Sequence, residues 1–363
     1  MKAETKRAQT PCLVVEPARA QSVLDLLRAK GWVDVNYEVG KANGRILIPI
    51  REDSAELVEN AHLGEMEMAV RSPLLQRPGS LQKELSAILT SEQMGELGSS
   101  FDIIGDIAQL ELSDELGAKQ DAIAAAIMRL YPHVKTVVKK AESTGGAYRI
   151  RPVTVIAGEK RTRTISKENG CSLVVDLNEA YYNPRVASER MRIVEQIGRR
   201  PAGGPGENVL VLFAGVGPYA ILAEKKAIAM PAKIVAIELN PKAVEMMEEN
   251  IKLNHCKRIE AVCADVEKEL AKPRYLEWAD RIIMPHPSDS MRFLPIVLKA
   301  AKKGAIIHLY AFGQAEDPLS ERLAEAQEIG QKLGLTLSLH AWRVVRTYSP
   351  NLVQIVMDLW VGL

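Results

Sequence analysis

The chain has 363 residues, of which 47% are hydrophobic and 26% are charged, and its mean hydropathy is −0.07. These values are typical of a folded globular protein and exclude a disordered or fibrous chain. No apolar run reaches the ~20 residues that a membrane-spanning helix requires, and 47 basic residues nearly balance 46 acidic ones. A chain of this length is expected to form two or three domains.

The cysteines and the N-terminal residues predict a compartment. The four cysteines show no CxxC spacing and are too few for a disulfide scaffold, which suits a reducing environment. The first seven residues are mostly polar or charged, and no apolar core of a signal peptide follows them. We therefore expect a cytoplasmic protein without a zinc site, another metal site or membrane attachment.

The first 70 residues predict a small α+β domain. A strand-like run at 12–16 is followed by a helical stretch at 18–30. Two further apolar runs cover 33–39 and 45–50. Proline, glycine and serine then recur between residues 71 and 98, as in a linker that contains one helix.

Residues 99–168 predict a second α+β domain. A strand is expected at 101–106, an amphipathic helix at 117–130, and two further strands at 134–138 and 148–157.

Charge is unevenly distributed along the first half of the chain. Residues 51–130 contain 15 acidic and 6 basic residues, whereas residues 133–165 contain 8 basic and 2 acidic ones. Such a basic segment is typical of a phosphate-binding surface, and equally of an ordinary solvated face.

Residues 169–363 predict an α/β domain. Strands alternate with helices, which specifies a mostly parallel, doubly wound sheet. The expected strands are 209–213, 234–238, 261–265, 281–284 and 305–310. Two later strands, 335–346 and 352–360, are joined by a turn at 349–351 and are expected to form an antiparallel hairpin on the sheet edge.

A glycine pair predicts a cofactor site in this domain. Gly215 and Gly217 follow a predicted strand and open a predicted helix, so the backbone there can approach a ligand closely. Glu238 is expected at the end of the second strand, where a carboxylate can accept both hydroxyls of a ribose. Asp265 is expected at the end of the third strand, facing an adenine amino group. Either acid could instead serve only as a strand-end or capping group.

The identity of the ligand follows from the rest of the loop. A dinucleotide fingerprint requires a third glycine at position 220, but this chain has Ala220 there. Pro218 stands at the expected helix start. Both observations argue against a ligand that contains a pyrophosphate. S-adenosylmethionine, which contains adenosine without phosphate, fits better.

Nine motifs in order then resemble one family. They lie at 100–108, 146–151, 157–159, 168–171, 175–177, 181–185, 188–190, 213–218 and 343–350. Together they resemble the archaeal and eukaryotic Rossmann-type tRNA (guanine-N1)-methyltransferases, which act at position 37 beside the anticodon. The resemblance covers residue 99 to the C-terminus and, more loosely, the N-terminal domain.

This resemblance implies a class I, Rossmann-like methyltransferase domain preceded by two small α+β domains. It implies that the N-terminal domain checks the outer corner of the tRNA, that the basic segment of the middle domain binds tRNA, and that the anticodon stem-loop is also bound. It further implies that S-adenosylmethionine is the methyl donor. It also suggests a monomer, with no protein partner implied.

The resemblance also assigns roles to residues. By position in the motifs, Arg149 looks like the arginine that steadies guanine O6, and Glu189 like the general base. Tyr181 resembles the aromatic residue that lies against the donor. Phe213, beside the glycine pair in its motif, is also expected to bind the donor. Arg185 is expected to contact the substrate.

The chemistry of guanine supports the first two roles independently. N1 is a poor nucleophile until its proton leaves, which a carboxylate such as Glu189 can accept. Negative charge then moves to O6, where a guanidinium such as Arg149 stabilises it. Structural alternatives remain open: Glu189 could form surface ion pairs with Arg185 and Arg192, and Arg149 could contact phosphate.

The chain departs from the family pattern at two places. Val211 stands where an acidic residue usually ends the first Rossmann strand. The usual Asn-Leu-Pro turn after the fourth strand reads Pro285-His286-Pro287, and proline cannot supply the side-chain contact of asparagine. His286 could replace that contact or act only as a rigid turn element, and all three residues are expected near the substrate.

These departures leave two alternative functions. One is the related aminocarboxypropyl transfer of the wyosine pathway, in which the same donor supplies a larger group to a modified guanine. The other is a tRNA-binding protein that has lost its catalytic loop. The Glu189 position favours N1 methylation, because an acceptor without the N1 proton has less use for a base.

Overall fold

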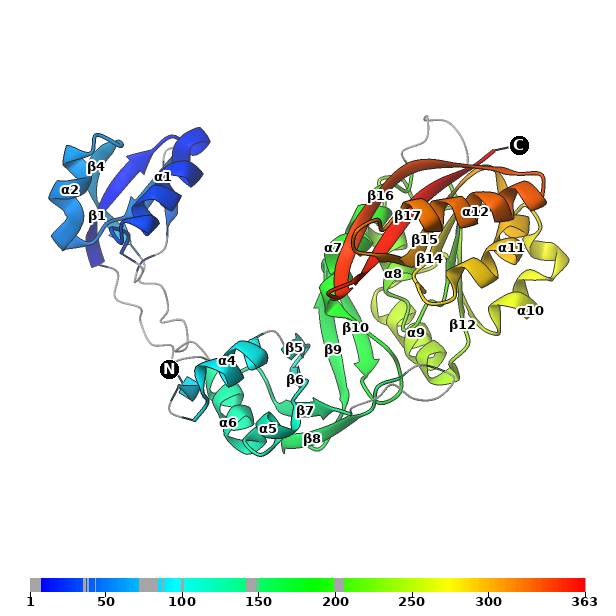
Figure 1. Ribbon diagram of the computed structural model, residues 1–363, viewed down its shortest axis with the longest axis horizontal. Coiled ribbons are helices and arrows are strands. Elements are labelled where there is room, and N and C mark those ends of the chain that lie inside the picture. Colours follow the sequence, from blue (N-terminus) through cyan, green and yellow to red (C-terminus); the bar gives the residue numbers. More distant parts are fainter. Residues whose placement is uncertain are drawn as a thin grey trace. The chain divides into compact units, whose positions relative to one another are not determined.

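The computed structural model describes residues 8–34, 37, 39–42, 44–71, 84–86, 88–98, 101–141, 148, 150–198 and 206–362. The chain divides into two compact units, residues 1–87 and 88–363 (Figure 1). The division falls within the segment 71–98, where the sequence predicts a linker. Across these ranges, no helix is both long enough and apolar enough to cross a membrane.

The first unit is a four-stranded sheet in the order β2-β3-β1-β4. Its elements are β1 (Ala8–Val15), α1 (Pro17–Ala29), β2 (Gly40–Ala42), β3 (Arg45–Pro49), η1 (Glu52–Ser54), α2 (Ala55–Asn60) and β4 (Glu65–Arg71). Leu13, Leu27, Ile48 and Val58 belong to its buried core. The predicted strand at 12–16, the helix at 18–30 and the strand at 45–50 are confirmed. The apolar run 33–39 forms no named strand; Val33 makes one isolated bridge with Ile50, and residues 35, 36 and 38 lie outside the described residues.

The second unit begins with a four-stranded sheet in the order β5-β6-β7-β8. Its elements are α4 (Ser91–Gly98), β5 (Phe101–Ile104), β6 (Ile107–Leu110), α5 (Asp114–Gly117), α6 (Gln120–Leu130), β7 (Thr136–Lys140) and β8 (Val153–Gly158). Ile123, Ile127 and Leu130 are buried, as the helical periodicity predicts.

Two strand predictions in this sheet need correction. The strand expected at 101–106 is only the first arm of a hairpin: Gly105 adopts a φ of +58°, the chain turns, and β6 returns antiparallel. The strand expected at 148–157 begins only at Val153, directly after a proline that cannot donate a ladder hydrogen bond.

A long hairpin that the sequence analysis did not predict follows, made of β9 (Arg163–Glu168) and β10 (Cys171–Asp176). The boundary expected between residues 168 and 169 lies at its turn. Side chains of the middle sheet such as Ile104 and Val138 share one buried core with Leu173 and Val175 of the hairpin. The hairpin therefore packs continuously with both neighbouring parts of the second unit.

The largest element is a seven-stranded sheet in the order β13-β12-β11-β14-β15-β17-β16. Its strands are β11 (Asn208–Leu212), β12 (Lys233–Glu238), β13 (Ile259–Cys263), β14 (Ala279–Met284), β15 (Ala301–Gln314), β16 (Thr336–Ser349) and β17 (Leu352–Gly362). The first five strands pair in parallel, as predicted. The C-terminal hairpin lies on the sheet edge, as predicted, with β17 antiparallel to both β15 and β16.

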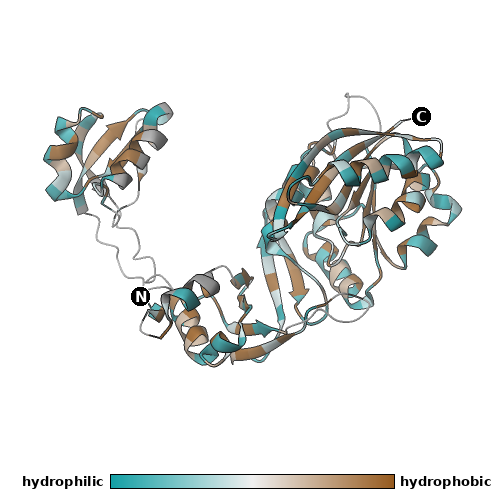
Figure 2. Cartoon of the chain, viewed as in Figure 1, coloured by the Kyte–Doolittle hydropathy of each residue, from teal (hydrophilic) through white to brown (hydrophobic). Residues whose placement is uncertain are grey.

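Helices cover both faces of this sheet. They are η2 (Pro184–Val186), α7 (Ala187–Val194), α8 (Pro218–Lys226), α9 (Pro241–Leu253), α10 (Val266–Leu270), η3 (Pro273–Tyr275), α11 (Ser290–Ala300) and α12 (Ser320–Lys332). Residues of α7, α8 and α9 pack on one face, and residues of α10, α11 and α12 on the other. Figure 2 shows hydrophobic residues concentrated on the strands between them. The strand order reverses between β11 and β14, which creates a ligand-binding position at the carboxyl ends of these strands.

Candidate functional site

The glycine turn lies directly after β11. Gly215 and Gly217 have φ values of +56° and +85°, which glycine adopts without strain. A Cβ on Gly217 would lie 2.7 Å from Cγ of Met247 in α9, so that helix packs against bare backbone. Gly217 is also the N-cap of α8. The prediction that Gly215 and Gly217 form a tight turn between a strand and a helix is therefore confirmed.

Glu238 ends β12, as predicted, and holds this turn. One of its carboxylate oxygens accepts a hydrogen bond of 2.8 Å from the backbone N–H of Gly215, and the other accepts one of 2.9 Å from that of Asn240. A carboxylate oxygen can accept two hydrogen bonds, so each retains capacity for a ligand hydroxyl.

Asp265 is placed differently from the prediction. Strand β13 ends at Cys263, and Asp265 is the N-cap of α10, where Oδ1 accepts a hydrogen bond of 3.1 Å from the Lys268 backbone. The expected strand-end position is therefore wrong, because the chain has already left the sheet. The alternative role that the sequence left open, a helix cap, is the one that Oδ1 of Asp265 has.

The loop that carries Tyr181 lies over the glycine turn. A Cβ on Gly215 would lie 3.6 Å from the backbone oxygen of Tyr181. The Asn240 side chain donates a hydrogen bond of 2.6 Å to the backbone oxygen of Glu179, which ties this loop to the end of β12. The Tyr181 side chain is 59% exposed. The structure therefore brings together three of the predicted donor-binding residues, Tyr181, Gly215 and Glu238.

The proline-flanked loop lies at the same edge. Strand β14 pairs with β11 and ends at Met284, so the loop at 285–287 lies beside the glycine turn. The His286 ring stacks on Phe213 with ring centroids 4.5 Å apart. Phe213 also packs against Phe293 of α11 and has a φ of +52°, which is unusual for a residue with a side chain. Val211 is fully buried in β11.

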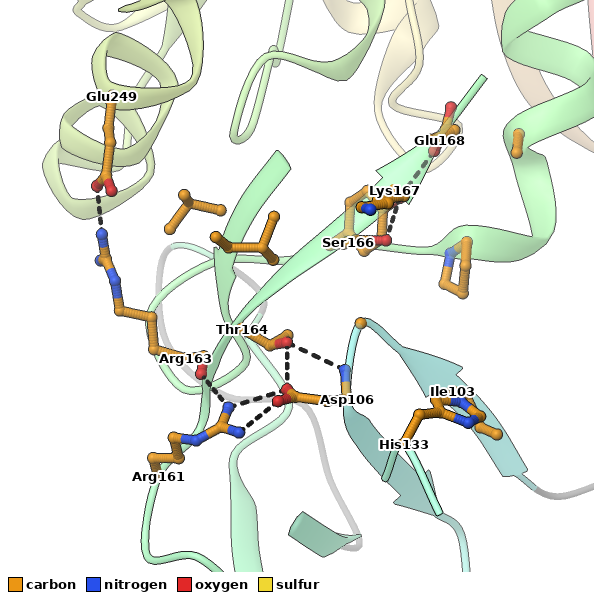
Figure 3. A pocket seen from close by; sticks show the side chains of 16 residues that line it. Ile103, Asp106, His133, Arg161, Arg163, Thr164, Ser166, Lys167, Glu168 and Glu249 are labelled. Carbon is orange, nitrogen blue, oxygen red and sulfur yellow. Dashed lines mark hydrogen bonds and ion pairs between the residues drawn. The ribbon is translucent and has the colours of Figure 1, made fainter. Parts of the chain in front are cut away.

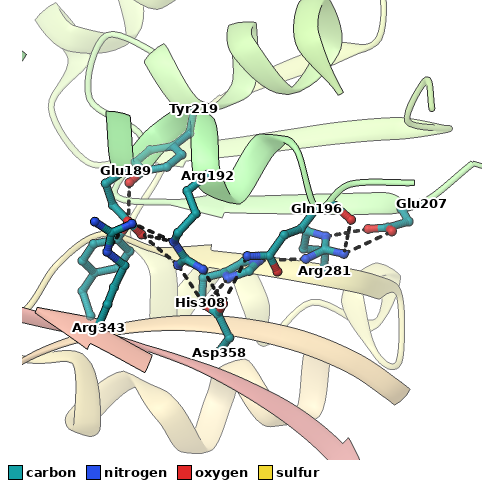
Figure 4. A network of polar contacts seen from close by, with 10 residues as sticks. Glu189, Arg192, Gln196, Glu207, Tyr219, Arg281, His308, Arg343 and Asp358 are labelled. Atoms are coloured by element: carbon teal, nitrogen blue, oxygen red, sulfur yellow. Dashed lines mark hydrogen bonds and ion pairs between the residues drawn. The ribbon is translucent and has the colours of Figure 1, made fainter. Parts of the chain in front are cut away.

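Glu189 lies on α7 and is 97% buried, with 3% of its surface exposed (Figure 4). Its carboxylate accepts hydrogen bonds from Nε of Arg192 at 3.0 Å and from a terminal nitrogen of Arg192 at 2.8 Å. The alternative of an ion pair with Arg192 is therefore confirmed as a contact, but the Glu189 carboxylate is buried and the Arg192 side chain is only 22% exposed, so this pair does not lie on an open surface. Arg185 pairs instead with Asp102 of β5, at 2.7 Å.

Glu189 is linked to the glycine turn through two tyrosines. The Tyr310 hydroxyl of β15 donates to Oε1 of Glu189 at 3.3 Å, and it lies 2.6 Å from the Tyr219 hydroxyl. Tyr219 is the second residue of α8, directly after the turn. Burial raises the pKa of both phenols above the ordinary value, so both stay protonated at neutral pH.

The polar network extends beyond Glu189 into the sheet. Arg192 also donates to Asp358 of β17 at 2.6 Å, and Nδ1 of His308 in β15 lies 2.7 Å from the same carboxylate. His308 and Asp358 have no exposed surface. The sequence analysis missed this pair, although a histidine and an aspartate within strongly apolar strands were a usable signal.

Comparisons with known proteins agree with this geometry. The TRM5/TYW2 methyltransferase domain matches residues 164–337, and the TYW2 N-terminal domain matches residues 81–162. The chain is 34% identical over 330 residues to a protein named tRNA (guanine(37)-N(1))-methyltransferase Trm5b from Pyrococcus abyssi, covering 90% of this chain and 92% of that protein. The chain belongs to the TRM5/TYW2 methyltransferase family.

Solved structures of family members extend along nearly the whole chain. The crystal structure of wild-type Trm5b from Pyrococcus abyssi aligns with a TM-score of 0.69 at 31% identity, covering 98% of this chain and 100% of that one. A structure described as the complex of aTrm5 and tRNALeu aligns with a TM-score of 0.66 at 26% identity, covering 96% and 99%. These neighbours share the class I fold predicted from the sequence.

The basic segment of this family member is partly neutralised by distant acids. Arg149 lies outside the described residues. Arg151 pairs with Glu111, which also lies 3.8 Å from the Lys140 ammonium. Within the same segment, Arg161 pairs with Asp106.

A cavity of about 880 Å³ lies where the two matched family domains meet (Figure 3). Its lining includes Arg161, Lys167, Glu168 and Tyr182. At its inner wall the buried Glu168 accepts hydrogen bonds from Arg190 at 2.6 Å and from the Tyr182 hydroxyl at 2.7 Å. The ion pair between Glu168 and Arg190 connects β9 to α7, the helix that also carries Glu189.

Proposed function

We propose that this protein transfers the methyl group of S-adenosylmethionine to N1 of guanosine 37 in tRNA. The observation that carries the proposal is the position of Glu189: a buried carboxylate, two hydrogen bonds away from the helix that starts at the glycine turn. The family supports the reaction type, since the Pyrococcus abyssi relative that bears this activity in its name matches over 92% of its length.

The donor would lie at the carboxyl ends of β11 and β12. Glu238 has acceptor capacity for the ribose hydroxyls, and the bare backbone of Gly215 allows close approach. The exposed Tyr181 and the ring of Phe213 flank the same turn. Asp265 would contact the adenine through the oxygen that does not cap α10.

The methyl transfer then needs only proton removal and charge stabilisation. The N1–H bond of guanine breaks as the Glu189 carboxylate accepts the proton, and the N1 electron pair attacks the methyl carbon. The carbon–sulfur bond breaks, and its electrons neutralise the sulfonium. Arg149 would stabilise the charge that forms on O6, in the role implied by its motif.

The tRNA would be held by several parts of the chain. The N-terminal unit would contact the outer corner, and the second unit would contact the anticodon stem-loop. Arg185 and the loop Pro285-His286-Pro287 would lie beside the target nucleotide, which must leave the anticodon stack to reach a closed pocket. The protein would act as a cytoplasmic monomer. The tRNA-bound relative supports the partner class.

The test is nucleoside mass spectrometry of unmodified tRNA transcripts after incubation with labelled donor. Wild type is expected to form 1-methylguanosine at position 37. Glu189→Gln is expected to lose roughly 10²- to 10³-fold in single-turnover rate with donor affinity retained, as for removal of a general base. Glu269→Gln, another buried carboxylate in ion pairs, is the matched control and is expected to retain the rate.

The same experiment separates the alternatives. A product carrying the heavier aminocarboxypropyl group would reassign the reaction to the wyosine branch. Absence of both products, together with no donor binding in calorimetry, would make the protein a tRNA binder without this chemistry.

A further inference from the structure

We infer that Arg192 is the positioning residue of the general base, and that the buried Asp358–His308 pair anchors Arg192 and offsets its charge. This inference rests on the proposed function. It assigns three residues from α7, β15 and β17 that the family motifs do not single out.

Arg192 holds two carboxylates at once. Toward Glu189 it presents Nε, 3.0 Å from each carboxylate oxygen, and one terminal nitrogen, 2.8 Å from Oε1. Toward Asp358 it presents its two terminal nitrogens, at 2.6 and 3.1 Å. All three guanidinium nitrogens are therefore engaged, and their planar geometry fixes one carboxylate relative to the other.

This arrangement selects one oxygen of Glu189. Oε1 accepts from Arg192 and from the Tyr310 hydroxyl, which uses its acceptor capacity. Within the described part of the chain, Oε2 accepts a hydrogen bond from Nε of Arg192, and Nε of Arg343 lies 3.5 Å away. The Arg343 side chain is 51% exposed, so Oε2 lies on the side that leads to solvent. Oε2 is therefore the atom that receives the N1 proton.

Hydrogen-bond chemistry fixes the state of His308. A terminal nitrogen of Arg281 lies 2.8 Å from Nε2 of His308, and a guanidinium can only donate, so Nε2 accepts. Nδ1 then carries the proton and donates to Asp358. Burial lowers the pKa of His308 to about 4, which agrees with a neutral ring. Arg281 is held in turn by Glu207 at 2.6 Å.

The consequence for catalysis is the placement of the Glu189 carboxylate. Among the residues that the structure describes, Arg192 and Arg343 are its ion-pair partners, and Tyr310 and Tyr219 are the neutral hydroxyls near it. Because Asp358 shares Arg192, the guanidinium charge is divided between two carboxylates. Without Asp358 the guanidinium would lose this second carboxylate, and with it the contact that fixes its plane against Glu189.

The test is the single-turnover methylation rate across a pH series, measured with saturating donor and tRNA. For Asp358→Asn, the plateau rate is expected to fall about tenfold, because Arg192 no longer holds the Glu189 carboxylate in place. Affinity for S-adenosylmethionine is expected to change less than twofold. The control Glu269→Gln is expected to retain the wild-type profile.

A second pair of variants guards against misfolding of the first. Arg192→Lys keeps the charge but cannot bridge both carboxylates, so it is expected to lose rate while keeping most donor affinity. Arg192→Gln is expected to lose more. If Asp358→Asn and Arg192→Lys both fold, bind donor and show the wild-type rate and profile, the inference is overturned. If wild type forms no 1-methylguanosine, the proposed function fails instead.

Discussion

The imidazole of His286 stacks on the ring of Phe213, with centroids 4.5 Å and planes 26° apart. This contact joins the loop after β14 to the loop after β11. It places the segment that departs from the family pattern against the turn at which we propose that the donor binds. The loop at 285–287 is therefore part of the proposed site, whether His286 contacts the target base or only packs against Phe213.

Replacement of His286 separates its two possible roles. A stacked aromatic pair contributes about 0.5–1.5 kcal/mol, so His286→Ala is expected to lower the free energy of unfolding by about that amount and to weaken donor binding by loosening Phe213. His286→Phe keeps the stack but removes both ring nitrogens. Calorimetry gives donor affinity, and single-turnover assays give the rate. If His286→Phe restores affinity but not rate, the ring nitrogens act on the target base. Full recovery of both would assign His286 to packing alone.

The glycine turn allows a matched steric test. Gly217→Ala is expected to lower the thermal midpoint and weaken donor binding, because the new Cβ would meet Met247 at 2.7 Å and the φ of +85° strains an L-residue. Gly334→Ala is the control, since Gly334 has a similar φ of +72° but nothing within 4 Å. The expected difference is about 1–3 kcal/mol of unfolding free energy. Equal losses in urea titrations would show that the Met247 contact is unimportant.

The buried histidine predicts an acid-dependent stability. The pKa of His308 is about 4 in the folded protein and 6.5 in its ordinary state, so the unfolded chain binds more protons between these values. The contribution of His308 to the free energy of unfolding is therefore fully present above pH 6.5 and is lost as the pH drops to 4, by up to about 3 kcal/mol. Asp358 adds to this loss at lower pH, because its pKa is held below the ordinary 3.8.

Thermal midpoints measured from pH 4 to 7 check this expectation. His308→Gln is expected to flatten the dependence, whereas His340→Gln, at an exposed position on β16, is expected to leave it unchanged. A wild-type dependence that persists in His308→Gln would assign it to other groups.

The hairpin of β9 and β10 shows why some elements could not be predicted from the sequence. In β9, Thr164, Ser166 and Glu168 face inward, so the strand lacks the apolar alternation that marks strands elsewhere. These polar side chains can be buried because residues of other segments form hydrogen bonds with them. For example, Arg190 and Tyr182 both donate hydrogen bonds to the Glu168 carboxylate. Likewise Arg161 pairs with the nearby Glu159 and also with Asp106, 55 residues away, and the second pair is one that no local charge balance reveals.

The sequence determined by itself what depends on local periodicity and special backbone geometry. Apolar runs specified the five parallel strands and the edge hairpin, and Gly215 and Gly217 marked the turn at the end of β11. Only the tertiary structure decided that Glu189 is buried and held by Arg192, because the anchor Asp358 is 166 residues from Arg192 along the chain. Burial and ion pairing of a charged group depend on which strands meet around it, and that is a property of the assembled sheet.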